Sequence, residues 1–577
     1  GLTLGAFAIG QRSGAPTLCP SPWPQIAETW NDTRAAAVTA GIMATAAPFA
    51  GDTESTVRRA LDRYAAAWVA ARADACDDTL VRESVPQTVL DQRLACLEDR
   101  RLHLAALVER LAAADDQALA NAIEAVEGLP PIDACAGLDL AAMFGGDRAH
   151  VEERMALREL IAQARAAAHT GRPAAAAPLI EEALTKARTI DSPPLLAEVL
   201  VLAAENDHNG ERPERALERG REALTVAVAG GDSVRASWAA LILVQTLAVH
   251  PDGSSRGDLL ALAEAFCRNA GEPSDLKVQL LMTQANELLD AGRFVEALGL
   301  FERARDLALA AGHPRAAALA LLSLGNGRGA TGDQEGSIAA YKEALAELEP
   351  LAGEMHPFFA KIHANIGAAL VELGKHDAAL ATFKRAMEIA AANFPDEDNR
   401  VGAAVLSNIG LSYSREGLPA EALAAYEEAL AVNERVYGAT HYYVANVLVN
   451  MARLFDDLGR LDEGLAAAAR ATAIQDEVLP PGHCELLVGR RIHAALLRQL
   501  GRRAEAVAML EPLFQHFATS ECPPPMIGQI ELEVARALAV HPGQDKARAL
   551  ALLDSAEGRL RGRNAKADIA RLRSALR

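Results

Sequence analysis

The sequence is poor in aromatic residues, and this shapes the fold that it can form. Aromatic side chains make up 4% of the 577 residues, although half of all residues are hydrophobic. The hydrophobic part is dominated by Ala and Leu, which are strong helix formers with little β-branching. This composition predicts an all-α protein built from many closely packed helices.

Basic residues are also in the minority. The chain carries 57 Lys and Arg against 77 Asp and Glu, a formal net charge of -20 at pH 7. A nucleic-acid-binding surface needs clustered Lys and Arg to neutralise phosphates. The basic stretch at residues 559–577 is interpreted as a solvated last helix. The charge therefore argues against nucleic acid as a partner.

Complete catalytic and metal-binding motifs are missing from the sequence. A protein kinase needs a glycine-rich strand turn, a Lys, a catalytic Asp and an Asp-Phe-Gly motif, and this set is absent. The glycines at 325–332 resemble a phosphate loop, but no strand precedes them. No H-E-x-x-H or C-x-x-C motif occurs. We expect no cofactor, no metal and no catalytic residue in this chain.

Long hydrophobic runs are absent, and a short one opens the chain. Residues 1–10 are apolar, and residues 13–24 are rich in Pro, Ser and Gly. A membrane-spanning helix needs about 20 apolar residues. We interpret residues 1–18 as the remnant of a membrane helix with a juxtamembrane linker, hence a possible membrane anchor, and a frayed terminus is the alternative.

Four of the seven cysteines lie in the first quarter of the chain. Cys76 precedes the turn at residues 83–86 by about eight positions, and Cys96 follows it by about ten, so antiparallel helices would place them at similar heights. We predict disulfides Cys76–Cys96 and Cys19–Cys135 if the chain is made outside the cytoplasm. Buried free thiols are the alternative.

Residues 19–149 are predicted to form a helical subdomain. Apolar residues recur at spacings of three and four between Leu90 and Leu111, which indicates an amphipathic helix. We expect Trp23, Trp30 and Trp68 to fill its core.

From about residue 150 the chain repeats itself. A turn glycine recurs about every 40 to 43 residues, a small residue stands seven positions before it, and a bulkier residue stands nine positions after it. We predict a solenoid of about nine stacked helix pairs over residues 150–522, one of them divergent, with capping helices at 523–577. The clearest turn glycines are Gly292, Gly332, Gly374, Gly417, Gly459 and Gly501.

This register of small and large residues resembles the tetratricopeptide repeat, for example in Gly-Lys-His-Asp-Ala-Ala-Leu at 374–380. The usual period is about 34 residues. The longer units here are similar to the repeats of kinesin light chain. The resemblance implies a right-handed superhelical solenoid that binds proteins or peptides.

The segment before the repeats is similar to the post-membrane region of myxobacterial-type serine/threonine protein kinases. The similarity is carried by the four early cysteines and by residues 30–34 and 61–68. It implies the regulatory tail of a membrane kinase whose catalytic domain lies upstream of Gly1, on the periplasmic face of a bacterial inner membrane. A free-standing peptide receptor or scaffold without a kinase, and a cytoplasmic location, are the alternatives.

A ligand-binding groove is predicted on the first helix of each pair. Nine residues before the turn glycine, the five central units carry a polar residue, and the matching position in kinesin-light-chain-like arrays is commonly Asn facing bound peptide. A row of donors and acceptors suits an extended peptide, but such amides could instead bond neighbouring helices. The predicted groove residues are Thr283, Ser323, Lys361, Asn365, Asn408, Asn446, Asn450, Arg453 and Arg491.

Overall fold

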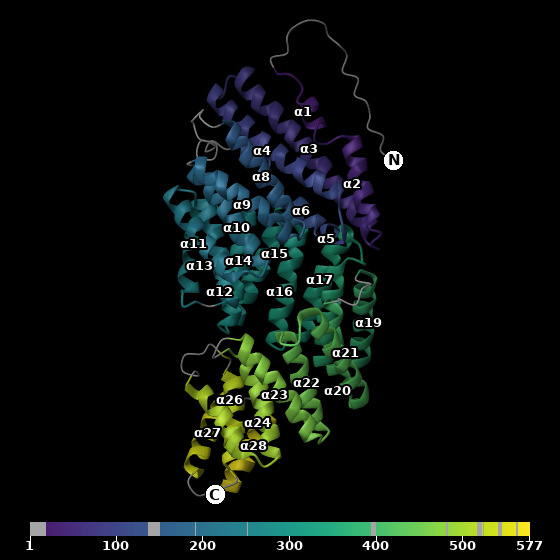
Figure 1. Ribbon diagram of the computed structural model, residues 1–577, viewed down its shortest axis with the longest axis vertical. Helices are drawn as coiled ribbons and strands as arrows, with labels where there is room; N and C mark the ends of the chain where they lie inside the picture. Colours follow the sequence, from purple (N-terminus) through teal and green to yellow (C-terminus); the bar gives the residue numbers. More distant parts are fainter. Residues whose placement is uncertain are drawn as a thin grey trace. The chain divides into compact units, whose positions relative to one another are not determined.

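The described part of the chain is entirely helical. The structure, a computed structural model, describes residues 19–136, 151–190, 192–250, 252–393, 400–479, 483–515, 522, 524–539, 545–560 and 563–576. Every regular element in these ranges is a helix, and no β-strand occurs among them (Figure 1). This confirms the prediction of an all-α fold. No helix in these ranges is both long and apolar enough to cross a membrane. The membrane-helix remnant predicted at residues 1–18 lies outside the described residues.

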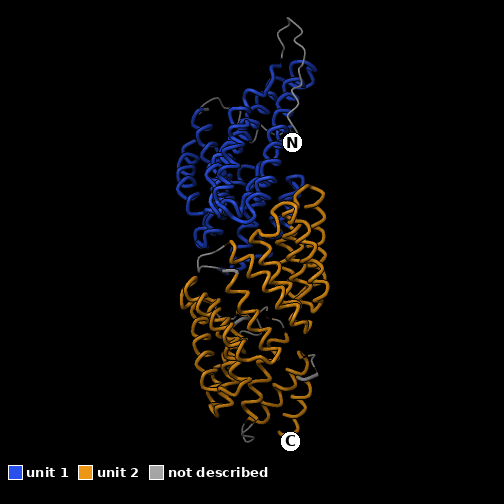
Figure 2. Tube along the Cα trace, turned by 90° about the vertical axis from the view of Figure 1, so that its right-hand side faces the viewer, with its two compact units in different colours: residues 1–280 blue, residues 281–577 orange. Residues whose placement is uncertain are grey.

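The chain divides into two compact units, residues 1–280 and 281–577 (Figure 2). Unit 1 contains an N-terminal group of helices and the first helix pairs, and unit 2 contains the later pairs and the C-terminal helices. The division falls inside α14 (Ser274–Asp290), within the range predicted as the repeat array.

The N-terminal helices of unit 1 surround a core that contains two of the three predicted tryptophans. The indole N–H of Trp68 donates to the carbonyl of Leu97 at 2.6 Å, and Trp30 donates to the Asp62 carboxylate at 2.8 Å. The prediction for Trp23 is wrong, because this side chain is 58% exposed on a helix of only five residues. The elements are α1 (Trp23–Ala27), α2 (Asp32–Ala44), α3 (Ala50–Leu80), α4 (Gln87–Ala112), α5 (Asp116–Ala120), α6 (Ala122–Glu127) and the 3-10 helix η1 (Asp133–Ala136).

The predicted disulfide pairing is wrong, although all four cysteines are bonded. The structure pairs Cys19 with Cys76 and Cys96 with Cys135, with Cα–Cα distances of 5.8 and 5.6 Å. The direction of the side chains explains the difference. The side of α3 that faces α4 carries Asp78, which accepts from Arg93 at 3.0 Å. Cys76 precedes Asp78 by two residues, about 200° around the helix, so it points away from α4. Equal height along two helices was therefore not sufficient for a bond.

Helix pairs continue through both units in the range predicted as a solenoid. Within each unit, and apart from α14, consecutive helices of each pair pack on each other and neighbouring pairs stack. The described pairs are α8 (Val151–His169) with α9 (Pro173–Ile190), α10 (Pro193–Asn209) with α11 (Pro213–Ala229), α12 (Ser233–Val249) with α13 (Arg256–Asn269), α14 with α15 (Phe294–Ala310), α16 (Pro314–Ala330) with α17 (Gln334–Ala352), α18 (Pro357–Glu372) with α19 (His376–Asn393), α20 (Arg400–Glu416) with α21 (Pro419–Tyr437), α22 (Tyr442–Asp457) with α23 (Leu461–Val478), and α24 (Glu485–Gln499) with α25 (Arg503–Leu510).

The turn glycines end the first helix of each pair. At Gly374 the backbone takes φ +69°, and the N–H of Lys375 donates back to the carbonyl of Leu370 at 2.9 Å. A left-handed residue followed by this long backward bond is the Schellman arrangement, which glycine adopts without strain. Glu211 adopts φ of +55° at the equivalent position after α10, and the N–H of Arg212 donates back to the carbonyl of Asp207 at 2.9 Å, so the geometry persists where the sequence pattern fades.

Close packing between the two helices of a pair explains the small residue before each turn. A Cβ added at Gly367 would lie 2.4 Å from the ring of Phe383 on the second helix, and one added at Gly325 would lie 2.4 Å from Tyr341. Both rings are buried in the core of their pairs. The first helix thus turns this face toward its own partner helix.

The C-terminal residues add a further pair and a last helix. The short 3-10 helix η2 (Glu511–Gln515) leads toward α26 (Pro524–Leu538), which packs on α24, α25 and α27 (Lys546–Arg559), and α28 (Arg563–Leu576) packs on α27. A third disulfide joins Cys484, at the start of α24, to Cys522, which lies shortly before α26. The seventh cysteine, Cys267, is buried and free.

Candidate functional site

The predicted groove residues lie on the first helices of successive pairs in unit 2. Among these helices, α18 contacts α20, α20 contacts α22, and α22 contacts α24. Residues at the same repeat position on neighbouring first helices therefore form a row. Asn365, Asn408 and Asn450 occupy one such position on α18, α20 and α22.

This row faces away from the second helix of each pair. Gly410 lies against Tyr426 of α21, as Gly367 does against Phe383. Asn408 precedes Gly410 by two residues, which is about 200° around the helix, so it lies on the opposite side. On α22, Asn446 and Arg453 lie four residues before and three after Asn450, so all three share one helix face. This face of the first helices is the one on which the groove was predicted.

The hydrogen bonds of the amides separate Asn365 from the others. Asn365 Nδ2 lies 3.4 Å from Asn326 Oδ1 of the preceding pair, and the Tyr341 hydroxyl donates to that same oxygen at 2.6 Å. Asn408, Asn446 and Asn450 are half-buried, and the described residues supply no hydrogen bond to their side chains. The alternative that these amides bond neighbouring helices thus fits Asn365 and not the other three.

The remaining predicted residues differ in exposure. Thr283 is only 4% exposed, so its prediction as a groove surface is wrong, because packing around α14 covers it. Ser323 on α16 is half-buried, and Lys361 on α18 and Arg453 on α22 are exposed. Arg491 on α24 is half-buried.

Arg453 and Arg491, on the neighbouring helices α22 and α24, are near enough for the charge of one to act on the other. Burial lowers the pKa of the Arg491 guanidinium, and the charges of Arg453 and Arg536 lower it further, against the opposing charges of Glu533 and Asp456. Neither side chain makes an ion pair or hydrogen bond with the described part of the chain.

Of the acidic groups around these arginines, Glu533 and Asp456 have other partners, whereas Asp457 lies near Arg453, whose charge lowers its pKa against the larger effect of burial. Glu533 on α26 accepts from Arg498 at 2.6 Å and from Arg536 at 2.9 Å. Arg536 also donates to Asp568 at 2.7 Å, and Asp456 accepts from the Gln499 amide. The Glu533 carboxylate is 2% exposed and is held between its two arginines.

Unit 1 contains a buried ion network that sequence reasoning missed. It runs through four helices with one main residue on each: Asp99 on α4 pairs with Arg158 on α8 at 2.8 Å, and Arg158 lies 3.7 Å from Glu198 on α10. Glu198 in turn pairs with Arg235 on α12 at 3.2 Å. Residues so far apart in sequence show no common motif, so only the packing of α4 on α8 reveals the network.

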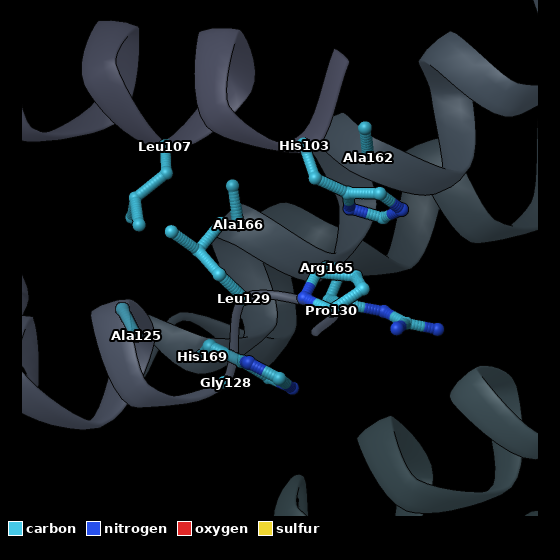
Figure 3. Close-up of a pocket in the computed structure, with 10 residues that line it drawn as sticks. All are labelled: His103, Leu107, Ala125, Gly128, Leu129, Pro130, Ala162, Arg165, Ala166 and His169. Carbon is cyan, nitrogen blue, oxygen red and sulfur yellow. The ribbon is translucent and has the colours of Figure 1, made fainter. Parts of the chain in front are cut away.

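The network shifts the pKa values of its members. Burial raises the pKa of Glu198, but Arg235, Arg158 and Arg165 outweigh it and lower the pKa to about 2. Burial lowers the pKa of His103, one turn after Asp99, to about 4. His103, Arg165 and His169 line a cavity of about 10 Å³ (Figure 3), which is room for about one water molecule. The cavity is too small for a larger ligand.

A larger pocket of about 290 Å³ lies between α3, α4 and η1 beside Cys135. Three of its charged lining residues are paired, because Asp78 accepts from Arg82 at 2.8 Å and from Arg93 at 3.0 Å; the other two are Asp74 and Asp133. Among the residues that the structure describes, no group of three or more His, Cys, Asp or Glu side chains is placed to hold a metal ion.

Comparison with known protein families identifies the repeats. Two family models, both described as tetratricopeptide repeat, match residues 360–393 and 402–477, which are α18 to α19 and α20 to α23. A curated relative, Protein KINESIN LIGHT CHAIN-RELATED 3 of Arabidopsis thaliana, is 26% identical over 155 residues, 26% of this chain and 24% of the relative. The match thus spans about a quarter of the relative's length. Residues 360–393 and 402–477 thus match tetratricopeptide repeats, and about a quarter of the chain is similar to a kinesin-light-chain-related protein.

Solved structures with helical repeats are also similar to this chain. BtubC (BKLC) from P. vanneervenii is 22% identical, with a TM-score of 0.33 over 40% of this chain and 91% of that one. Aspartyl phosphate phosphatase F from Bacillus subtilis is 13% identical, with a TM-score of 0.39 over 73% of this chain and 92% of that one. The identification of the repeats depends on the family models.

Proposed function

We propose that the first-helix face of unit 2 binds an extended segment of a partner protein. Tetratricopeptide repeats are protein-binding scaffolds. The proposal specifies which surface of the chain the partner contacts. The observation that carries it is the row of half-buried amides on α20 and α22, Asn408, Asn446 and Asn450, that have no partner among the described residues. Each amide offers both a donor and an acceptor.

An extended backbone satisfies such a row. The three amides are half-buried and have no partner in the described part of the chain, and a peptide presents N–H and C=O groups at regular intervals. Side chains at one repeat position on stacked pairs meet those groups in order. A core position would instead favour an apolar residue such as Ala, which stands at the neighbouring buried position Ala452.

The test is a matched set of variants of the full chain. Asn365→Ala, Asn408→Ala and Asn450→Ala are combined, and affinity is measured for a peptide selected by the wild-type chain from a displayed library of random linear peptides. We expect each lost contact to weaken binding by about 0.5 to 1.5 kcal/mol, with an unchanged melting temperature. Asn365 should contribute least, because it already contacts Asn326.

Asn269→Ala, at the exposed end of α13 in unit 1, is the control and should bind as the wild type does. Unchanged affinity in the triple variant would place the site elsewhere on the chain. A large fall in melting temperature would show that the amides are structural.

We further propose that this scaffold is the sensor half of a membrane serine/threonine kinase, tethered on the periplasmic face of a bacterial inner membrane. The proposal is supported by the similarity of residues 19–135 to such proteins and by cysteine pairs placed for disulfides, which persist in oxidising compartments. Mapping of disulfide-linked peptides in protein exported to a periplasm should find Cys19–Cys76 and Cys96–Cys135; free thiols would contradict it.

A free-standing peptide receptor or assembly scaffold is the second candidate. It is supported by the two family matches, which are to tetratricopeptide repeats. The reading frame upstream of residue 1 distinguishes the two candidates, since a kinase domain encoded there supports the first and contradicts the second.

A further inference from the structure

We propose that the pocket between α3, α4 and η1 binds a small aliphatic amine, whose ammonium group is held by Asp74 and Asp133 and whose hydrocarbon tail lies inside. The pocket belongs to unit 1, so this inference goes beyond the peptide groove proposed for unit 2 and does not depend on it. It is carried by three features: how the walls are anchored, where the lining is apolar, and which lining charges have no partner.

The pocket is open because small side chains line it. On α3 the lining residues Ala71 and Ala75 stand one turn apart, and they leave about 290 Å³ unfilled beside α4 and η1. Larger residues at these positions would fill that space. The volume is roughly that of ten water molecules, which is enough for a small organic ligand.

The third wall, around η1, is fixed to the helices. The Cys96–Cys135 disulfide joins η1 to α4. Three side chains of α3 and α4 also donate to carbonyl groups of this segment: Tyr64 to Pro130 at 2.8 Å, Arg100 to Pro131 at 3.2 Å and Arg93 to Ala136 at 3.2 Å. A pocket whose walls are held in place before the ligand arrives loses little freedom on binding.

The lining changes from apolar to charged toward the surface. Its buried members are Ala75, Leu97, Ile132 and the disulfide-bonded Cys135. Asp74 on α3 and Asp133 on η1 are exposed, so they stand where the pocket opens to solvent. A ligand that matches this lining has an apolar end inside and a polar end at the mouth.

The charges at the mouth select a cation. Asp78 accepts from both Arg82 and Arg93, whereas Asp74 and Asp133 make no hydrogen bond or ion pair with the residues that the structure describes. Three Asp against two Arg give the lining a net charge of -1, which one ammonium group balances. A metal ion suits the pocket less well, because no described cluster of three or more Asp, Glu, His or Cys could hold one.

The experiment compares three ligands of similar length on the full chain: n-pentylamine, n-pentanol and 1,5-diaminopentane. Pentanol carries no charge, and the diamine would bring a second ammonium group into the apolar interior. Ligand-observed NMR titrations at low salt measure the Kd of each. We expect pentylamine to bind with a Kd on the order of 1 mM, about fivefold more tightly than either of the others.

Two variants separate the mouth from the interior. Asp74→Asn combined with Asp133→Asn should remove the advantage of pentylamine over pentanol and leave pentanol binding unchanged. Ala71→Leu should abolish binding of all three ligands, because it fills the pocket without altering its charge. Asp91→Asn is the matched control: it changes an exposed acid of α4 outside the lining, and it should bind as the wild type does. Circular dichroism melting checks that each variant is folded.

Three results would overturn the inference: no binding of pentylamine, equal affinity for pentylamine and pentanol, or a preference that survives in the double Asn variant. Displacement of pentylamine by an equal concentration of MgCl2 would assign the carboxylates to a metal ion instead. Tighter binding of the peptide Gly-Lys-Gly would assign the pocket to a lysine of a partner protein, which also contradicts it. Each of these results leaves the proposal for unit 2 standing.

Discussion

The two units place charged and polar residues on their first helices in contrasting ways. In unit 1, Asp99, Arg158, Glu198 and Arg235 satisfy one another across four helices. In unit 2, Asn408 and Asn450 have no hydrogen-bond partner among the described residues, and Arg453 and Arg491 make no ion pair there. The same helix-pair scaffold can therefore hold polar groups either as internal connections or as open binding positions. Whether each group has a partner, rather than its residue type, distinguishes the two roles.

Breaking the buried ion network of unit 1 should have the largest effect on stability. Asp99→Asn leaves Arg100 and Arg158 without their buried carboxylate, which lies 2.6 and 2.8 Å from them. We expect the free energy of unfolding of unit 1 to fall by about 3 to 5 kcal/mol, with peptide binding by the folded chain unchanged. Tryptophan fluorescence during urea unfolding measures this specifically, because all four tryptophans lie in residues 1–280.

The control for that measurement is Glu264→Gln, which removes an exposed ion pair with Arg268 in unit 1 and should change stability by less than about 1 kcal/mol. A loss as small in Asp99→Asn as in this control would show that the network does not hold unit 1 together.

Acid should weaken unit 1 in a second, smaller way. The pKa of His103 is lowered from 6.5 to about 4 in the fold, so between these pH values the unfolded chain binds a proton that the folded chain does not. Stability should therefore be complete above pH 6.5 and fall as pH drops toward 4, by roughly 2 to 3 kcal/mol. Glu198, lowered from 4.5 to about 2, extends the loss in the same direction below pH 4.5.

Urea unfolding at several pH values, followed by tryptophan fluorescence, checks this. In His103→Gln the slope between pH 6.5 and 4 should flatten, and the part below pH 4.5 should persist. An unchanged slope in this variant would assign the acid sensitivity to other groups.

Removing the charge of Arg491, which makes no ion pair with the described residues, should have the smallest effect on stability. Arg491→Gln eliminates a half-buried cation without an ion-pair partner, so we expect the melting temperature to stay the same or rise slightly. Arg498→Gln, on the same helix, takes one of two arginines from the buried Glu533 and should cost about 1 to 3 kcal/mol. Thermal unfolding by circular dichroism compares the two, and equal losses would mean that Arg491 is a structural residue.

Local patterns were sufficient to predict the helix pairs. The small residue at Gly367 and the ring at Phe383 come from one repeat of about 42 residues, and they meet because each pair folds on itself. Helix periodicity also located the N-terminal helices.

Features that depend on direction or on distant packing could not be read from the sequence. The cysteine pairing failed because the prediction considered the height of Cys76 along its helix and not the side from which it points. Asp99 and Arg158 are 59 residues apart, and nothing in either segment marks them as partners. For the groove, the pattern predicted a row of amides, but only the structure separates Asn365, which has a neighbour, from Asn408 and Asn450.

The Cys484–Cys522 disulfide gives the region of α24 a closed covalent ring. The ring contains both α24 and α25, and thus Arg491. A single protease cut anywhere inside this ring opens the loop without releasing a fragment, because the two ends remain joined through sulfur. The arginine-bearing helix therefore stays attached to the preceding repeats after a cut that would detach the C-terminal helices from an uncrosslinked chain.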